Sequence, residues 1–430
     1  MKPISRRTIV KAALATGIAA AGQTAARAQT PAAVRMLHIE TNRAVLDIWQ
    51  KAASGFEAAN PGVKVEMRSL ETEAFKARLP TILQSNSRPH LFYSWGGGLV
   101  DQQAKAGFLE DIAAQIDPAY RATMMPGAMA EFSRGAAIYG LPYNTARIGL
   151  LYNRDIFEKF GLTVDAMLTW PGFLKGVQTL KAAGIVPVAA GGQDKWQLML
   201  MLSNLCLRQG GRAAIEDALA GRDQGFDNPA FVRAAELYRE FSALSPYQEG
   251  FMAMKAQPAS GLFADGKAAM LMHGSWFVRQ NPAVAADRKG LSVEQLGFLG
   301  FPMLPGGAGT AKETLVNLNG WLVSKGAPRA AVDFLKYFHA VPVAGELAAG
   351  GFIVPANLSV LDRLSHPLMR DTAQSIAGMD FIQTGYNVLL GANAGKVSED
   401  ISVGLASATL TAKAACSQLE RARQQDVREG

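Results

Sequence analysis

The sequence has few residues of the kinds that hold metal ions or form cross-links. Its 430 residues include two cysteines and five histidines. Cys206 and Cys416 lie far apart, in neither a CxxC pair nor a metal-binding spacing. This favours two buried free thiols, although export would permit a disulfide between them. Because there is also no HExxH motif and no Cys/His cluster, we predict no metal site and no cofactor.

Motifs that bind nucleotides or carry a serine nucleophile are absent as well. The glycines at 96–98 follow an apolar run that ends in Ser94-Trp95. A P-loop needs GxxxxGK[ST] and a dinucleotide fingerprint needs a third spaced glycine, but Leu99-Val100-Asp101 comes next. The "HGSW" stretch at 273–276 lacks the second glycine of a GxSxG elbow. The sequence therefore argues against a nucleotide-binding protein and against a serine hydrolase.

The positive charge is concentrated at the start of the chain. Residues 1–28 contain five basic residues and no acid, so removing them lowers the formal net charge from +7 to 7 − 5 = +2. They combine a twin-arginine pattern at 5–11, a short Ala/Gly-rich stretch and a small-x-small site at 26–28. We predict a twin-arginine signal peptide over 1–28 and a periplasmic protein. Residues 29–430 contain no run of basic residues with interleaved aromatics, which argues against nucleic acid as a partner.

Strand-like and helix-like segments alternate along the remaining 430 − 28 = 402 residues. The apolar run 34–40 precedes Asn42, which can cap a helix with apolar residues at helical spacing. The same alternation continues through 63–67, 73–84 and 89–95, repeats over about 146–300, and gives way to mostly helical sequence from about 341. This rhythm predicts two α/β lobes with mostly parallel sheets, and a ligand in the crevice at the strand ends.

Four tryptophans stand beside Gly, Asn or Asp at predicted strand-to-helix junctions. They are Trp95, Trp196, Trp276 and Trp321. An aromatic face can stack on the C–H face of a sugar ring, while neighbouring amides and carboxylates bind its hydroxyls. For each tryptophan taken alone, packing in the core is an equally good explanation.

Several acidic residues leave an enzymatic alternative open. A glycosidase needs two carboxylates about 5–10 Å apart across the scissile bond. Candidates for such a pair are Glu40, Glu71, Glu73, Asp101 and Asp194. The same acids are equally expected to accept hydrogen bonds from sugar hydroxyls.

A series of motifs in conserved order resembles one protein family. They are "GFEAANPGVKVE" (55–66), "FYSWGGGLVDQQAKAGFLEDI" (92–112), "YGLPYNTARIGLLYNRDIFEKFGL" (139–162), "TWPGFLKGVQTLKAAGIVPVAAGGQDKW" (169–196), "LFADGKAAMLMHGSW" (262–276), "NGWLVSK" (319–325) and "GGFIVPANLSV" (350–360). In their order and spacing the chain resembles the extracellular solute-binding proteins of family 1, the sugar-binding subunits of bacterial ABC importers. Unlike some members, it has no lipidated cysteine.

The resemblance implies an α/β fold of the two-lobed periplasmic-binding-protein type (type II), with sugar bound between the lobes. It implies a first lobe of 31–145 plus about 303–340 and a second of 146–302 plus about 341–430, with hinges near 144–147 and 297–305. By the same resemblance, the ligand-binding residues are Glu40, Asn42, Trp95, Gly96, Gly97, Tyr143, Asn144, Asp194, Trp196, Trp276, Asn319, Trp321 and Tyr386.

The resemblance predicts the function of the whole chain. We expect a monomeric periplasmic protein that binds a mono- or oligosaccharide, delivers it to an ABC transporter permease and catalyses no reaction. Two alternatives remain open at this point. One is a secreted carbohydrate-active hydrolase, and the other is a sugar-sensing subunit for a chemoreceptor or kinase.

Overall fold

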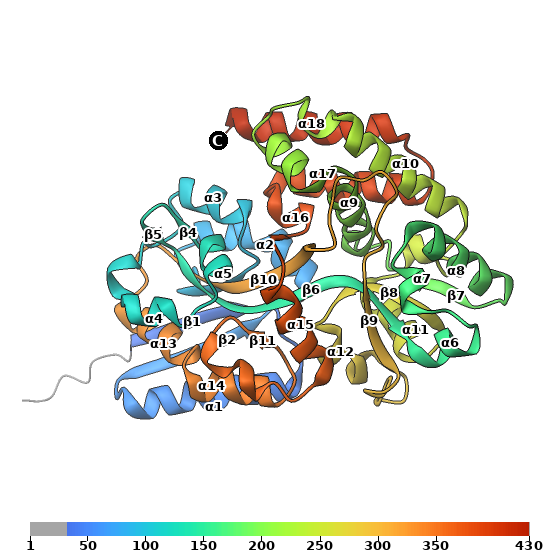
Figure 1. Ribbon diagram of the computed structural model, residues 1–430. Helices are drawn as coiled ribbons and strands as arrows, with labels where there is room; N and C mark the ends of the chain where they lie inside the picture. The colour runs from blue at the N-terminus through green and yellow to red at the C-terminus, as the bar shows by residue number, and fades with distance from the viewer. Residues whose placement is uncertain (1–31, 430) are drawn as a thin grey trace, which may run out of the picture.

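The computed structural model describes residues 32–429, which form two lobes joined by crossing strands (Figure 1). The signal peptide predicted at 1–28 lies outside the described residues. Within them, no helix is long and apolar enough to cross a membrane.

The first lobe begins with the predicted alternation of strands and helices. The Asn42 side chain caps α1 by accepting a hydrogen bond from the Val45 amide, as expected of a residue with this short polar side chain. The elements are β1 (Ala32–His38), α1 (Arg43–Ala59), β2 (Val63–Ser69), α2 (Thr72–Gln84), β3 (Leu91–Ser94), α3 (Gly98–Lys105), η1 (Ala113–Gln115), α4 (Pro118–Ala122), α5 (Pro126–Glu131), β4 (Ser133–Arg134) and β5 (Ala137–Ile138).

The second lobe is entered through a long strand, β6. Thr169 caps α8 by accepting from the Gly172 amide, again as predicted. The elements are β6 (Gly140–Asn153), α6 (Arg154–Lys159), α7 (Val164–Met167), α8 (Trp170–Ala182), β7 (Val186–Ala189), α9 (Trp196–Leu219), η2 (Gly225–Asp227), α10 (Pro229–Ala243), η3 (Phe251–Ala253), α11 (Ala256–Ala264), β8 (Ala268–Gly274), α12 (Phe277–Val284) and β9 (Leu296–Gly300).

The last third of the chain returns to the first lobe and then ends in the second. Val343, Leu347 and Ile353 pack in the core of the first lobe, whereas the sequence-based boundary placed them in the second. The elements are β10 (Glu313–Val323), α13 (Arg329–Phe338), α14 (Val341–Ala349), β11 (Val354–Pro355), η4 (Leu358–Arg363), α15 (Pro367–Ala377), β12 (Phe381–Gln383), α16 (Tyr386–Leu389), α17 (Ala392–Ala406) and α18 (Ala412–Glu429).

The sheets of the two lobes are continuous through β6, in the order β2-β1-β3-β10-β6-β8-β7. The outer pairs are parallel, β1 with β2 and β3, and β7 with β8. β10 runs antiparallel to β3 and β6, β6 runs antiparallel to β8, and the short β12 adds a parallel pairing to β10. The first part of β6 pairs with β10, and its second part pairs with β8 and β9. The predicted hinge at 144–147 thus lies inside a strand shared by both lobes, and the α/β class with mixed sheets is confirmed.

Each lobe has its own apolar core. In the first, the rings of Trp49, Tyr143, Trp321 and Phe338 meet edge to face. In the second, α9, α10, α17 and α18 pack together on the sheet. Cys206 and Cys416 are both buried free thiols, as the sequence favoured.

Candidate ligand-binding site

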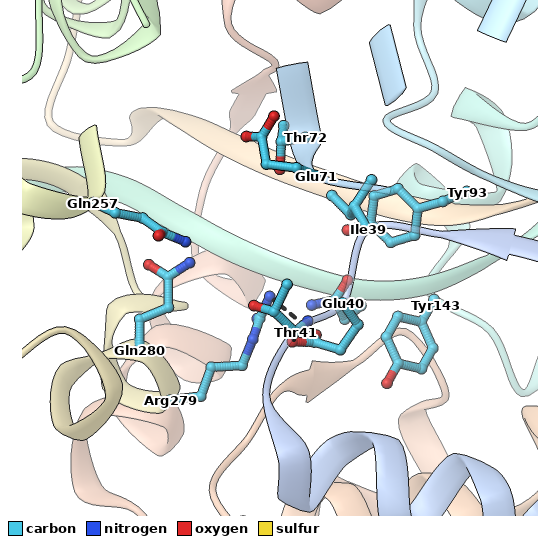
Figure 2. A pocket seen from close by; sticks show the side chains of 11 residues that line it. Ile39, Glu40, Thr41, Glu71, Thr72, Tyr93, Tyr143, Gln257, Arg279 and Gln280 are labelled. Atoms are coloured by element: carbon cyan, nitrogen blue, oxygen red, sulfur yellow. Dashed lines mark hydrogen bonds and ion pairs between the residues drawn. The ribbon is translucent and has the colours of Figure 1, made fainter. Parts of the chain in front are cut away.

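A pocket of about 560 Å³, including its open mouth, lies between the two lobes (Figure 2). Its lining comes from strand ends of the first lobe and from two helices of the second. The lining residues are Ile39, Glu40, Thr41, Glu71, Thr72, Tyr93, Tyr143, Asn144, Gln257, Arg279 and Gln280.

The first-lobe wall is formed where neighbouring strands end. Glu40 and Thr41 follow β1, and Tyr93 lies at the end of β3, which runs parallel to β1. Because the carboxyl ends of parallel strands meet at one edge of a sheet, these side chains converge there. Tyr143 and Asn144 join them from β6.

The second-lobe wall is formed by α11 and α12. Gln257 lies in the first turn of α11, and Arg279 and Gln280 lie near the start of α12, immediately after Trp276. Figure 2 shows Gln257, Gln280 and Arg279 on the side opposite Tyr93 and Tyr143.

An ion pair joins the two walls. A guanidinium nitrogen of Arg279 lies 3.5 Å from Glu40 Oε2, and both side chains are largely buried, with 14% and 10% of their surface exposed. Glu40 Oε1 accepts hydrogen bonds from the backbone amides of Thr41 (3.0 Å) and Asn42 (2.8 Å). Asn42 Nδ2 in turn donates to the Arg279 carbonyl at 3.0 Å. Asn42 therefore helps to hold α12 against the first lobe.

The two tyrosines of the pocket stay protonated at ordinary pH. Burial raises the pKa of both Tyr93 and Tyr143, so that neither phenol loses its proton near neutrality. Trp49 Nε1 donates to the Tyr143 hydroxyl at 3.0 Å, which leaves that hydroxyl free to donate.

A buried neighbour on β10 orients the side-chain amide of Asn144. Asn319 is buried on β10, and its Nδ2 donates to Asn144 Oδ1 at 2.8 Å. The NH₂ group of Asn144 is left as the donor at the pocket. Both asparagines were predicted to bind the ligand. Asn144 lines the pocket, and Asn319 acts through Asn144 as a positioning residue.

Trp95 is half-buried beside the pocket and is not one of its lining residues. The edges of Tyr93 and Phe75 contact it at centroid distances of 5.4 and 5.8 Å. Lys76 Nζ lies over the ring, 5.8 Å from its centroid, and 3.9 Å from Glu399 of the second lobe. Lys76, at the interface between the lobes, therefore covers one face of the Trp95 ring, which was predicted to stack on a sugar.

The glycine turn after Trp95 touches protein on both sides. A Cβ atom on Gly96 would lie 3.0 Å from the Cβ of Glu131. Gly97 has φ +64°, and a Cβ there would lie 2.9 Å from the Val388 carbonyl oxygen in the second lobe. We call the contact of residues 97–98 with residues 388–391 the lobe seam. Gly96 and Gly97, both predicted to bind the ligand, are buried here and are not among the lining residues of the pocket.

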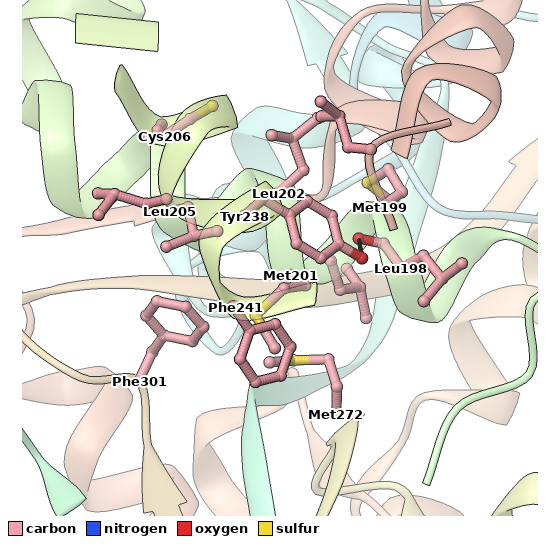
Figure 3. Packing of buried hydrophobic residues seen from close by; sticks show 14 of the residues in the cluster. Leu198, Met199, Met201, Leu202, Leu205, Cys206, Tyr238, Phe241, Met272 and Phe301 are labelled. Carbon is pink, nitrogen blue, oxygen red and sulfur yellow. Dashed lines mark hydrogen bonds between the residues drawn. The ribbon is translucent and has the colours of Figure 1, made fainter. Parts of the chain in front are cut away.

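Trp196 and Trp276 form an aromatic cluster with His273 in the second lobe. Ring centroids of Trp196 and Trp276 are 6.1 Å apart, and His273 lies 5.2 and 4.7 Å from them. Both tryptophans are half-buried, and neither lines the pocket. Trp196 begins α9, whose following residues anchor it in the core (Figure 3). Asp194 accepts from the Ala256 amide at 2.8 Å and so ties this loop to the start of α11.

Trp321 and Tyr386 are fully buried. Trp321 lies within β10, whose two faces are both covered, and its ring meets Trp49, Tyr93 and Tyr143. Tyr386 packs against Phe226 beneath α16. The placement of Trp321 at a strand-to-helix junction was therefore wrong, and both side chains belong to the cores.

Sequence reasoning missed the second-lobe wall entirely. Gln257, Arg279 and Gln280 were not among the candidates, nor were Thr41, Thr72 and Tyr93, while Glu71 was considered only as a catalytic acid. Arg279 follows the "HGSW" motif by three residues, so the start of the next helix was the available signal. No group of His, Cys, Asp and Glu suited to a metal ion occurs within residues 32–429.

The chain matches one family and several solved structures. The sequence model of the bacterial extracellular solute-binding protein family matches residues 42–339. A multiple sugar-binding protein of Streptococcus mutans is 23% identical over 268 residues, which cover 58% of this chain and 59% of that protein. The match thus spans about three-fifths of the length of this curated relative.

Two solved structures share the fold. One comes from work on xylan utilisation by the thermophilic bacterium Caldanaerobius polysaccharolyticus, with a TM-score of 0.82 and 23% identity over 90% of this chain and 99% of that one. The other is a chitin oligosaccharide binding protein, with a TM-score of 0.81 and 24% identity over 93% and 99%. These similarities confirm the two-lobed architecture predicted from the sequence.

Proposed function

This chain belongs to the bacterial extracellular solute-binding protein family, and we propose that it captures a carbohydrate between its lobes for delivery to the permease of an ABC importer. The ligand is a mono- or oligosaccharide, and no reaction is catalysed. Export by the twin-arginine route and a monomeric, periplasmic state are part of the same proposal. They rest on the sequence of residues 1–28 and on the family.

The polar lining of the pocket between the lobes supports this proposal most strongly. Arg279, Gln257 and Gln280 supply donors from one lobe, and Glu40 and Asn144 supply polar groups from the other. A sugar presents hydroxyl groups all around its ring, each able to donate and accept, so it can bridge the two walls. Contacts available only when both lobes touch the ligand would favour the closed arrangement.

The surroundings of the two pocket carboxylates favour binding over hydrolysis. Glu40 uses one oxygen on two backbone amides and the other on Arg279. Glu71 caps α2, with Oε2 accepting from the amides of Glu73 (3.0 Å) and Ala74 (3.1 Å). A general acid must present its proton to the glycosidic oxygen. These two acids are instead held by the backbone and by an arginine.

The half-buried aromatic residues extend the proposed site beyond the pocket. Trp95 stands on the first-lobe side, and Trp196 and Trp276 stand on the second. We assign these rings to stacking against further sugar units once the lobes separate. The similarity to a solved chitin oligosaccharide binding protein agrees with a ligand of more than one unit.

A thermal-unfolding screen tests the proposal. The purified chain is heated with xylo-, chito- and galacto-oligosaccharides, and each sugar is recovered for mass spectrometry. We expect one class to raise the melting temperature progressively with the logarithm of its concentration, with its mass unchanged. At 100 times Kd the added free energy of unfolding should be about 2.7 kcal/mol. A shortened sugar would favour the hydrolase, and no shift with any carbohydrate would contradict the proposal. If deleting the gene left uptake intact but abolished a chemotactic or transcriptional response, the sensor would be favoured.

A further inference from the structure

A second pocket lies at the hinge, where β6, β9 and α15 meet. Its volume is also about 560 Å³ including open space, and it shares no lining residue with the pocket described above. The lining residues are Arg147, Arg154, Val293, Leu296, Phe298, His366, Pro367, Leu368, Asp371 and Thr372. Strand β6 runs from one lobe to the other here, β9 pairs with its second part, and α15 lies beside β6 (Figure 1).

Arg147 carries a largely buried positive charge without a carboxylate partner. Its guanidinium stacks over the Phe298 ring, 5.0 Å from the centroid, and Nε reaches Thr314 Oγ1 at 3.5 Å. Among the described residues, no acid forms an ion pair with it. Burial lowers the pKa of Arg147. Burial, and then repulsion from Arg147, lowers the pKa of the neighbouring Arg208 to about 10. A guanidinium has five N–H donors, and most of those on Arg147 have no protein acceptor.

Arg154 adds a second guanidinium to the same pocket. It lies 5.6 Å from the centroid of the Tyr152 ring, and its Nε donates to the Leu296 carbonyl at 3.4 Å. Within residues 32–429 it too has no ion-pair partner. Arg147 is therefore held by an aromatic ring and a threonine hydroxyl, and Arg154 by an aromatic ring and a backbone carbonyl. The remaining N–H groups of a guanidinium can bind an oxyanion bidentately.

Neutral donors complete the lining. His366 Nδ1 accepts from the Leu368 amide at 3.2 Å, which places the proton of the neutral ring on Nε2. Burial and then the nearby Arg370 lower the pKa of His366, so it is neutral at pH 7. Asp371 is the one carboxylate among the lining residues.

We propose that this hinge pocket binds a small oxyanion, a phosphate or a carboxylate group, between Arg147 and Arg154. Neither the solute pocket nor any proposed step of transport uses these arginines. Because β6 also supplies Tyr143 and Asn144 to the solute pocket, the bound anion contacts the strand about which the lobes move. Asp371 in the same lining repels the anion and so weakens its binding.

Calorimetric titration of the purified chain with inorganic phosphate, and separately with citrate, tests the site at constant ionic strength. We expect saturable binding of at least one of them below about 10 mM. Arg154→Gln should weaken it by about tenfold, since one charge-assisted hydrogen-bonding group is lost. Asp371→Asn should tighten it by about threefold or more, because a like charge is removed. A folding defect cannot produce that gain.

Arg329→Gln is the matched control, since Arg329 is an exposed arginine on α13 that pairs with Asp333 at 3.7 Å. It should leave the affinity unchanged. Which of the two anions binds identifies the group as phosphate or carboxylate. Failure of both anions to bind, or an affinity that responds to neither Arg154→Gln nor Asp371→Asn, would overturn the proposal.

Discussion

At the scale of single residues, Glu40 connects the pocket to the second lobe. Its carboxylate holds the loop after β1 through two backbone amides and pairs with Arg279 across the cleft. Glu40→Gln keeps the size of the side chain but removes its charge. We expect the affinity for the carbohydrate, measured by calorimetry, to fall by about tenfold, the effect of losing one charged hydrogen-bonding partner. Asp47→Asn on the exposed face of α1 is the control, and equal affinities in the two variants would contradict this role.

Trp321 is a core residue, and its substitution should act on folding. The side chain is fully buried among four aromatic rings. Trp321→Ala should lower the free energy of unfolding by about 3–5 kcal/mol, measured in urea. Trp276→Ala is the comparison, because this tryptophan is only half-buried. A Trp321→Ala protein as stable as the wild type would show that the ring does not pack as the structure places it.

The sequence could not distinguish these two tryptophans. Trp321 in "NGWLV" and Trp276 in "HGSW" both stand beside glycine in apolar surroundings. Their environments differ because β10 is paired with a strand on each edge and is buried on both faces, whereas Trp276 directly precedes α12 and is half-buried. Local spacing carries no information on such contacts.

At the scale of elements, the lobe seam depends on Gly97. Its φ of +64° and the 2.9 Å approach to the Val388 carbonyl leave no room for a Cβ atom. Gly97→Ala should therefore hold the lobes apart and weaken carbohydrate binding several-fold. X-ray scattering of the ligand-saturated protein should give a larger radius of gyration than the wild type.

Gly107→Ala separates this effect from backbone strain. Gly107 also has positive φ (+72°), but no atom lies within 4 Å of the added Cβ. The Gly107→Ala substitution should lower the free energy of unfolding by about 1 kcal/mol, as expected when a glycine at positive φ is replaced. It should leave the closure of the two lobes intact. If both variants bind and close alike, the seam has no role in closure.

Helix caps were predictable, and strand pairing was not. Asn42 and Thr169 cap their helices through amides three residues ahead, so the signal lies within one turn. The pairing of β6 with strands of both lobes joins residues more than a hundred positions apart, such as Ile148 with both Leu315 and Gly274. Alternating hydrophobicity predicts that such strands exist but not which neighbours they pair with.

At the scale of the whole molecule, buried histidines should make stability depend on pH. Burial lowers the pKa of His38 and of His339 to about 4, and that of His273 to about 3. Each pKa is below its unfolded value of 6.5, so the stabilisation is complete above pH 6.5 and is lost as pH falls toward 4. From pH 7 to pH 5, each histidine should remove about 2 kcal/mol from the free energy of unfolding.

Two partly buried glutamates have the opposite effect on the pH dependence of stability. Burial raises the pKa of Glu131 and of Glu399, so protonation favours the folded state. Comparison with His38→Asn isolates one histidine from this background. The variant should lose about 2 kcal/mol less than the wild type between pH 7 and pH 5 in urea unfolding. Parallel pH profiles for the two proteins would show that His38 is not buried in its neutral form.

The central claim is that the whole chain is a carbohydrate receptor without catalytic activity. The most direct test is calorimetric titration of the wild-type chain with the oligosaccharide that raises its melting temperature most, followed by mass analysis of the recovered sugar. We expect one molecule bound per chain, a negative heat-capacity change from surface buried between the lobes, and a sugar of unchanged length. Saturable binding to no carbohydrate, or recovery of a shortened sugar, would contradict the claim.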